Sequence, residues 1–161
     1  MYSAPPTILR STLSDSLVLT LQSCRLTTRL LQSVHAQILI NDLLCSAPLL
    51  DAFTSSCFRS HCSHYASLFL RSLPDPQPSL WNSSVCMSLQ SEKFPSFFEL
   101  YGGMLLNGVS PRKTTLSAVL RSCAAHSATR FGEAFHSYIL KVGYDSDVIL
   151  QTGVRNSERQ S

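Results

Sequence analysis

The chain has 161 residues, of which 44% are apolar and 14% are charged, and its formal net charge is +3. This apolar content suffices for a buried core and excludes a wholly disordered chain. The small positive charge permits contact with phosphate groups but lacks the dense basic patch that would indicate nucleic-acid binding alone. The most apolar early stretch, residues 13–31, is interrupted by polar and charged residues, so no membrane-spanning helix and no membrane partner are predicted.

The first forty residues combine several Ser and Thr with three arginines and a single acid, Asp15. That composition is typical of an organelle transit peptide, and a Ser-rich helix start is the alternative. We therefore predict that residues 1–13 are a disordered N-terminus or part of a transit peptide. The predicted destination is a mitochondrion or a chloroplast.

The six cysteines are spread along the chain with no repeated close pair, which predicts reduced, mostly packed thiols. The nearest approach to a metal cluster is the group Cys57, His61, Cys62 and His64. No second pair with zinc-type spacing follows it, so neither a metal nor another cofactor is predicted.

Internal repetition is the most informative feature of the sequence. Residues 31–39 (LQSVHAQIL) resemble 133–140 (EAFHSYIL), and 101 positions separate His35 from His136. Residues 21–24 and 120–123 repeat a second pattern, Leu-x-Ser-Cys. Such self-similarity is typical of stacked helical repeats.

Apolar residues recur at helical spacing between these copies. First helices of helix pairs are predicted at 48–60, 79–89 and 114–125, and second helices at 65–73, 94–105 and 131–142. Short connections, at 61–63, 91–95 and 126–129, make each pair an antiparallel hairpin. Proline-rich or Gly-containing turns near 73–78, 107–111 and 142–146 separate the pairs. The predicted fold is all-α, an α-solenoid of stacked antiparallel helix-turn-helix repeats with a period near thirty-five residues.

Several runs in order resemble the plant pentatricopeptide repeat family, in the subclass with alternating P, L and S repeats. They are 79–82 (SLWN), 97–101 (FFELY), 107–111 (NGVSP), 115–123 (TLSAVLRSC) and 132–143 (GEAFHSYILKVG). On this pattern about four repeats occupy 14–147: an L-like repeat at 12–46, overlapping the N-terminus, an S-like one at 47–77, a P-like one at 78–112 and an L-like one at 113–147. Residues 148–161 form an incomplete S-like repeat and a polar tail, so a short or truncated member is expected.

The resemblance implies that the chain binds single-stranded RNA of an organelle and takes part in RNA processing, editing or modification, with other RNA-processing proteins as further candidate partners. It places the principal base-reading side chain just inside each first helix and a second one at the end of each repeat. The first set is Asp51, Asn82, Ser117 and Thr152, and the second is Gln77, Arg112 and Asp147. The family's usual pairing of Asn with Asp favours a pyrimidine, but Asn82 is paired with Arg112, so no base is assigned there.

Other interpretations of the same residues stay open. Trp81 is expected to pack between helices, His35 and His136 to be hydrogen-bonded interior or seam residues, and Asn82 and Ser117 either to cap their helices or to read RNA. The array is alternatively a protein-interaction module, or a non-functional truncated fragment. No phosphate-binding loop, nucleophile elbow, paired-carboxylate motif or deaminase zinc signature is present in the sequence, so no catalytic residue and no enzyme activity are predicted.

Overall fold

The computed structural model describes residues 7–23, 26–75, 77–90 and 94–125, together with Phe135, Ser137, Tyr138 and Lys141. The chain divides into two compact units, Met1–Asn107 and Gly108–Ser161, which are considered separately. Every regular element in the described part is a helix. The all-α class predicted from the sequence is therefore confirmed.

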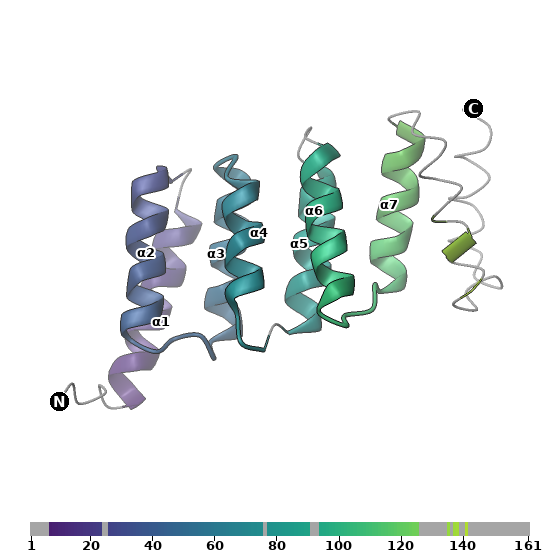
Figure 1. Ribbon diagram of the computed structural model, residues 1–161. Coiled ribbons are helices and arrows are strands. Elements are labelled where there is room, and N and C mark those ends of the chain that lie inside the picture. Colours follow the sequence, from purple (N-terminus) through teal and green to yellow (C-terminus); the bar gives the residue numbers. More distant parts are fainter. Residues whose placement is uncertain are drawn as a thin grey trace. The chain divides into compact units, whose positions relative to one another are not determined.

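The described part of the first unit consists of three helix pairs (Figure 1). The pairs are α1 (Thr7–Gln22) with α2 (Thr28–Ile40), α3 (Ala47–Arg59) with α4 (Ser63–Ser72), and α5 (Pro78–Gln90) with α6 (Phe94–Leu106). The second unit contains α7 (Lys113–Ala125). The predicted first helices are confirmed by α3, α5 and α7, and two predicted second helices by α4 and α6. The third predicted second helix, at 131–142, lies almost wholly outside the described residues.

The helices of the first unit form two layers. Helix α3 contacts α1 on one side and α5 on the other, while α4 contacts α6. Figure 1 shows α2, α4 and α6 in front of the fainter α1, α3 and α5. We call α1, α3 and α5 the first-helix layer, because each of them is the first helix of its pair.

The predicted repeats 47–77, 78–112 and 113–147 begin at the first residues of α3, α5 and α7. The carbonyl oxygen of Ser46 accepts hydrogen bonds from the backbone N–H groups of Leu49 and Leu50 at the start of α3. The carbonyl oxygen of Gln77 does the same for α5, and that of Arg112 accepts from the backbone of Leu116 in α7. The last residue of one repeat is thus the residue on which the next first helix starts.

Two second helices end with the same local arrangement. The side-chain amide of Asn41 donates to the carbonyl oxygen of Gln37 over 2.9 Å, and that of Asn107 donates to Gly103 over 2.8 Å. The next residue has a positive φ in both places, 54° at Asp42 and 70° at Gly108. Helices commonly end on such a left-handed residue, which satisfies their last carbonyl groups.

Polar contacts join neighbouring helices of the first-helix layer. The carbonyl oxygen of Leu21, near the end of α1, accepts hydrogen bonds from Ser56 Oγ at 2.8 Å and from Arg59 Nη2 at 2.5 Å, both in α3. Ser14 of α1 and Ser46 before α3 are joined through their hydroxyl groups at 2.8 Å. These bonds satisfy groups that lack partners within their own helix, so they fix how the first two pairs pack.

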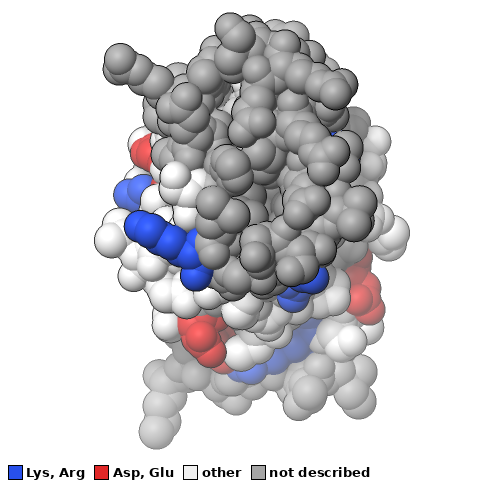
Figure 2. Space-filling model, turned by 90° about the vertical axis from the view of Figure 1, so that its right-hand side faces the viewer, with Lys and Arg blue, Asp and Glu red and all other residues white. Residues whose placement is uncertain are grey.

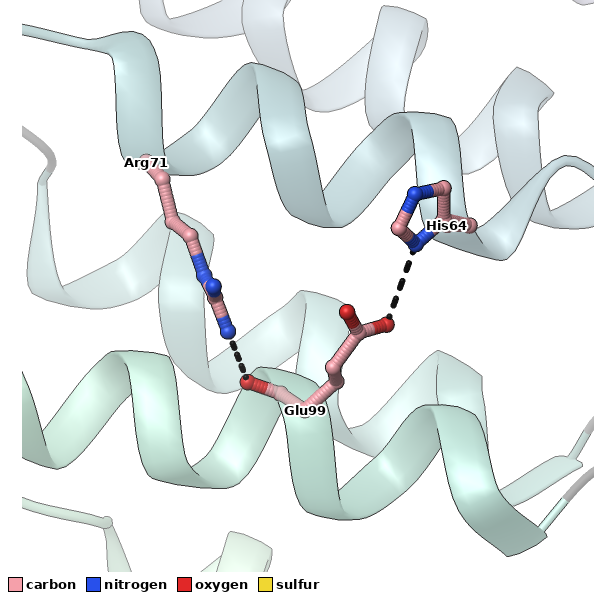
Figure 3. A network of polar contacts seen from close by, with 3 residues as sticks. All are labelled: His64, Arg71 and Glu99. Atoms are coloured by element: carbon pink, nitrogen blue, oxygen red, sulfur yellow. Dashed lines mark hydrogen bonds and ion pairs between the residues drawn. The ribbon is translucent and has the colours of Figure 1, made fainter.

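A small polar network joins the second helices α4 and α6 (Figure 3). Arg71 Nη2 donates to the carbonyl oxygen of Glu99 over 3.1 Å, and His64 Nδ1 lies 3.3 Å from Glu99 Oε2. His64 is 71% exposed, so this ion pair contributes little to stability. The Arg71 bond is the more informative contact because it fixes the backbone of α6 against α4.

The structure departs from the sequence prediction at two helix starts. Helix α6 begins at Phe94, so Pro95 lies in its first turn and not in the preceding connection. Proline fits there because the first N–H groups of a helix have no intrahelical partner to lose. Helix α1 begins at Thr7, inside the range 1–13 that the sequence analysis set apart from the first repeat. Within the described residues, no helix has the length and apolar content needed to cross a membrane.

Candidate functional site

Three of the predicted base-reading residues occupy one position in successive first helices. Asp51 is the fifth residue of α3, Asn82 the fifth of α5 and Ser117 the fifth of α7. Equivalent positions follow from the equivalent helix starts at Ser46, Gln77 and Arg112. Two further predicted readers, Asp147 and Thr152, lie outside the described residues.

Asp51 is the exposed member of this set. Its Oδ1 atom accepts a hydrogen bond of 3.1 Å from the hydroxyl group of Ser83 in α5. Its backbone carbonyl accepts from Thr54 Oγ1, a bond local to α3. The carboxylate therefore lies at the line where α3 and α5 meet, accessible to solvent.

Asn82 and Ser117 are mostly buried, with 4% and 9% of their surfaces exposed. The Nδ2 atom of Asn82 donates to the carbonyl oxygen of Pro78 over 2.8 Å, one helical turn earlier. Only small parts of these two side chains reach solvent. The sequence could not indicate this burial, because it depends on the side chains that surround each helix.

The two described residues at repeat ends, Gln77 and Arg112, have exposed side chains. The carbonyl oxygens of Gln77 and Arg112 accept hydrogen bonds from the first turns of α5 and α7. Gln77 lies in the first unit and Arg112 in the second.

Charges in the first-helix layer of the first unit balance. Helix α1 carries Arg10 and Asp15, α3 carries Asp51 and Arg59, and α5 carries no charged residue. Arg10 is engaged with Asp42 at 3.3 Å. Figure 2 shows mostly uncharged side chains among the described residues of the visible face, with small groups of either sign. Long-range attraction of a polyanion is therefore weak in this layer.

The predicted interior residues are confirmed where the structure describes them. Trp81 is completely buried. His35 Nδ1 lies 2.7 Å from the hydroxyl oxygen of Tyr65, and the imidazole also contacts the rings of Phe53 and Phe69. Burial lowers the pKa of His35 below its ordinary value. These residues stabilise the packing of the helix pairs. His136 lies outside the described residues.

The cysteines show no metal-binding arrangement in the described part of the chain. All five described cysteines are free thiols, and Cys57 and Cys123 are buried. Burial, with a smaller contribution from Cys62, raises the pKa of Cys57 to about 12, which keeps it protonated. Across the described residues no three His, Cys, Asp or Glu side chains are grouped as metal ligands would be.

Ser83 is a candidate functional residue that the sequence analysis missed. It follows Asn82 directly and therefore falls one position past the predicted reading site. Its hydroxyl group reaches back to Asp51, 32 positions earlier. A comparison of residues separated by one repeat length would have indicated this contact, as it would the pair formed by Ser14 and Ser46.

Comparison with known proteins supports the helical-repeat interpretation. No family model matches the chain. A pentatricopeptide repeat-containing protein of Arabidopsis thaliana is 27% identical over 124 residues, which are 77% of this chain and 18% of that protein. A second such protein is 31% identical over 105 residues, or 65% of this chain and 12% of that protein. The chain is a relative of the pentatricopeptide repeat proteins.

The likeness to pentatricopeptide repeat proteins extends over most of the chain but over little of each relative. A third relative, named as chloroplastic, is 28% identical over 137 residues, covering 83% of this chain and 18% of its own length. The chain thus spans less than a fifth of the length of these three relatives. Their shared name identifies the repeat, which agrees with the helix pairs of the first unit.

Proposed function

We propose that the chain is an RNA-binding segment of pentatricopeptide repeats of the subclass with alternating P, L and S units, and that it contacts single-stranded RNA through its first helices. The observation that carries the proposal is the equivalent placement of Asp51, Asn82 and Ser117, each the fifth residue of a first helix. Repeats that each present side chains to one nucleotide need such a regular spacing. The proposal assigns no catalytic step to these residues.

Plant organelles are the proposed location of this activity. One relative carries the word chloroplastic in its name, as does another that is 30% identical over 112 residues. A composition typical of a transit peptide in the first forty residues supports the same location. The proposed partner is an organelle transcript, bound in an extended single-stranded form, and the proposed role lies in its processing, editing or modification.

The expected affinity is modest. Stacking on side chains contributes roughly 1–3 kcal/mol per nucleotide, and ordering the RNA costs free energy. About four repeats with a charge-balanced layer therefore hold one sequence only loosely. Discrimination between bases is a more sensitive test than affinity alone.

The experiment exploits the mismatch between Asn82 and Arg112. The substitution Arg112→Asp creates the Asn-with-Asp combination that favours a pyrimidine in this family. Lys113→Asp is the matched control, because it makes the same charge change one position later at a site that is also exposed. Each variant is incubated at low salt with a random pool of short single strands, and the bound fraction is sequenced.

Enrichment of pyrimidines by Arg112→Asp but not by Lys113→Asp is the expected result. Equal losses of binding without any change in base preference would mean that both residues only contact phosphate. If no variant and no wild-type protein retains any strand, the RNA-binding proposal is wrong.

A protein-interaction role is the second candidate, and exposed aliphatic side chains favour it. Leu39, Ile40 and Leu106, at the ends of the second helices α2 and α6, have 54%, 72% and 87% of their surfaces exposed. Apolar side chains exposed to this degree are common at protein interfaces. Loss of RNA binding with retention of a protein partner would select this alternative.

A further inference from the structure

One of the two carboxylate oxygens of Asp51 accepts a hydrogen bond within the protein. Oδ1 accepts the Ser83 hydroxyl, as described above, and within the part of the chain that the structure describes no side chain bonds to Oδ2. The nearest acidic residue of the first-helix layer, Asp15, is in α1 and is also exposed. The arrangement presents a fixed carboxylate to solvent at the reading position of the repeat 47–77.

The Ser83 hydroxyl has a second hydrogen-bond acceptor besides the Asp51 carboxylate. Its hydroxyl oxygen lies 3.1 Å from Asp51 Oδ1 and 3.1 Å from the carbonyl oxygen of Leu80. A serine hydroxyl has a single proton, so the two acceptors share it. If the carboxylate turns to a ligand, the Ser83 hydroxyl still donates to the carbonyl oxygen of Leu80, so this donor keeps a partner.

A carboxylate only accepts hydrogen bonds, which restricts the bases that it can bind. The Watson–Crick edge of guanine presents two adjacent donors, N1–H and the N2 amino group. In adenine and cytosine a ring-nitrogen acceptor adjoins the amino group, and in uracil two carbonyl oxygens flank the only donor. These acceptors would face a negative carboxylate and be repelled.

We infer that Asp51, positioned by Ser83, makes the repeat 47–77 select guanine in single-stranded RNA. This inference rests on the RNA-binding function proposed above and goes beyond it by naming the base. Gln77, at the end of the same repeat, complements the carboxylate. Its exposed amide can donate to O6 of guanine, the acceptor that Asp51 cannot serve. The pair therefore matches the donor and acceptor pattern of one base.

The alternative is that the Asp51–Ser83 bond only ties α3 to α5. The test uses the whole chain, its Asp51→Asn variant and the matched control Asp15→Asn. Both substitutions remove one exposed negative charge from the first-helix layer, so the control accounts for the change in net charge. Only the first converts an acceptor-only group at the reading position into an amide that both donates and accepts. Circular dichroism verifies that each variant keeps its helices.

Fluorescence anisotropy compares short labelled strands of repeated AAG triplets with strands in which inosine replaces every guanosine. Inosine lacks only the N2 amino group, so the two probes differ in a single hydrogen-bond donor. We expect wild-type protein to prefer the guanosine strand by about fivefold, the low end of what a bidentate base contact provides. Asp15→Asn should keep this preference, and Asp51→Asn should lose it.

Equal binding of both strands by wild-type protein, or retention of the preference by Asp51→Asn, would overturn the guanine inference while leaving the RNA-binding proposal intact. Failure of every variant to bind either strand at low salt would overturn both. Ser83→Ala gives an independent measure, because a positioning hydroxyl predicts a reduced preference for guanosine with an unchanged helical signal.

Discussion

Left-handed backbone positions give the sharpest information at the scale of single residues. Three described residues have a positive φ, and two of them, Asp42 and His61, are not glycine. His61 follows α3, where the backbone N–H of Cys62 closes the turn on the carbonyl oxygen of Cys57 over 2.8 Å. A side chain beyond glycine costs roughly 1–2 kcal/mol in this conformation. His61 therefore carries backbone strain that a glycine at this position would not carry.

Replacing His61 by glycine should therefore stabilise the protein. The relief of strain exceeds the extra entropy of an unfolded glycine, so we expect a gain of about 0.5–1 kcal/mol in the free energy of unfolding. Chemical denaturation monitored by circular dichroism measures it. His61→Ala is the control, since it removes the imidazole but keeps the Cβ atom and should give no gain. An equal gain in both variants would show that the imidazole, and not the backbone conformation, destabilises the protein.

His35 makes stability depend on pH. Because burial lowers its pKa in the folded state, the neutral imidazole is favoured by folding. This contribution is complete above the unfolded pKa of about 6.5 and is lost as the pH falls through the lower folded value. We expect the unfolding midpoint to decrease between roughly pH 7 and pH 5, and to decrease less in His35→Gln, whose side chain can still bond to Tyr65. Identical profiles for the two proteins would exclude His35 as the source.

The burial of a side chain was predictable from the sequence where residues of its own helix indicate it. It was not predictable where residues of a neighbouring helix determine it. Apolar residues beside Trp81 in its own helix indicated that it packs inside. The burial of Asn82 and the bond from Ser83 to Asp51 depend on the placement of other helices. No periodicity within one helix encodes that placement, so the sequence predicted the helix that carries Asn82 but not the burial of its side chain.

At the scale of helices, the starts of α3 and α5 were predictable because each is marked in the chain. Proline lies within the first two positions of both α3 and α5, and glycine follows α6 at Gly108. The start of α1 lacks such a mark, and the helix extends through a Ser- and Thr-rich stretch that resembles a leader. The prediction of helix bounds is therefore limited more by missing proline or glycine markers at helix ends than by weak apolar periodicity.

Two adjacent glycines in α6, Gly102 and Gly103, differ in how closely other helices pack against them. A Cβ atom at Gly103 would lie 3.0 and 3.1 Å from two ring atoms of Trp81, which is completely buried and cannot yield. A Cβ atom at Gly102 would meet nothing within 4 Å. Gly103 thus permits the close approach of α6 to α5, while Gly102 only lowers helix propensity.

Substitution of each glycine by alanine should change stability in opposite directions. We expect Gly103→Ala to destabilise the protein by about 1–2 kcal/mol, because overpacking outweighs the gain in helix propensity. Gly102→Ala should stabilise it by roughly 0.5–1 kcal/mol. Thermal or urea unfolding of both variants measures the difference. Stabilisation of both would mean that the contact between α5 and α6 is looser than the structure shows.

At the scale of the whole molecule, the distribution of charge decides how RNA would be held. The first-helix layer of the first unit has two arginines and two aspartates, so it gains little from phosphate neutralisation. Two exposed cations, Arg112 and Lys113, stand at the start of α7 in the second unit. Binding that relies on these residues should depend far less on salt than that of proteins with extended basic surfaces.

The salt dependence of RNA binding should be correspondingly shallow. Two phosphate contacts to a single strand predict a slope of about −1.4 in a plot of log affinity against log salt, so a fourfold rise in salt weakens binding by about sevenfold. Anisotropy titrations over a series of potassium chloride concentrations measure the slope. Lys113→Ala should make it shallower by about 0.7, whereas Asp15→Asn should leave it unchanged. A slope several times steeper, unaffected by Lys113→Ala, would place the phosphate contacts on residues other than Arg112 and Lys113.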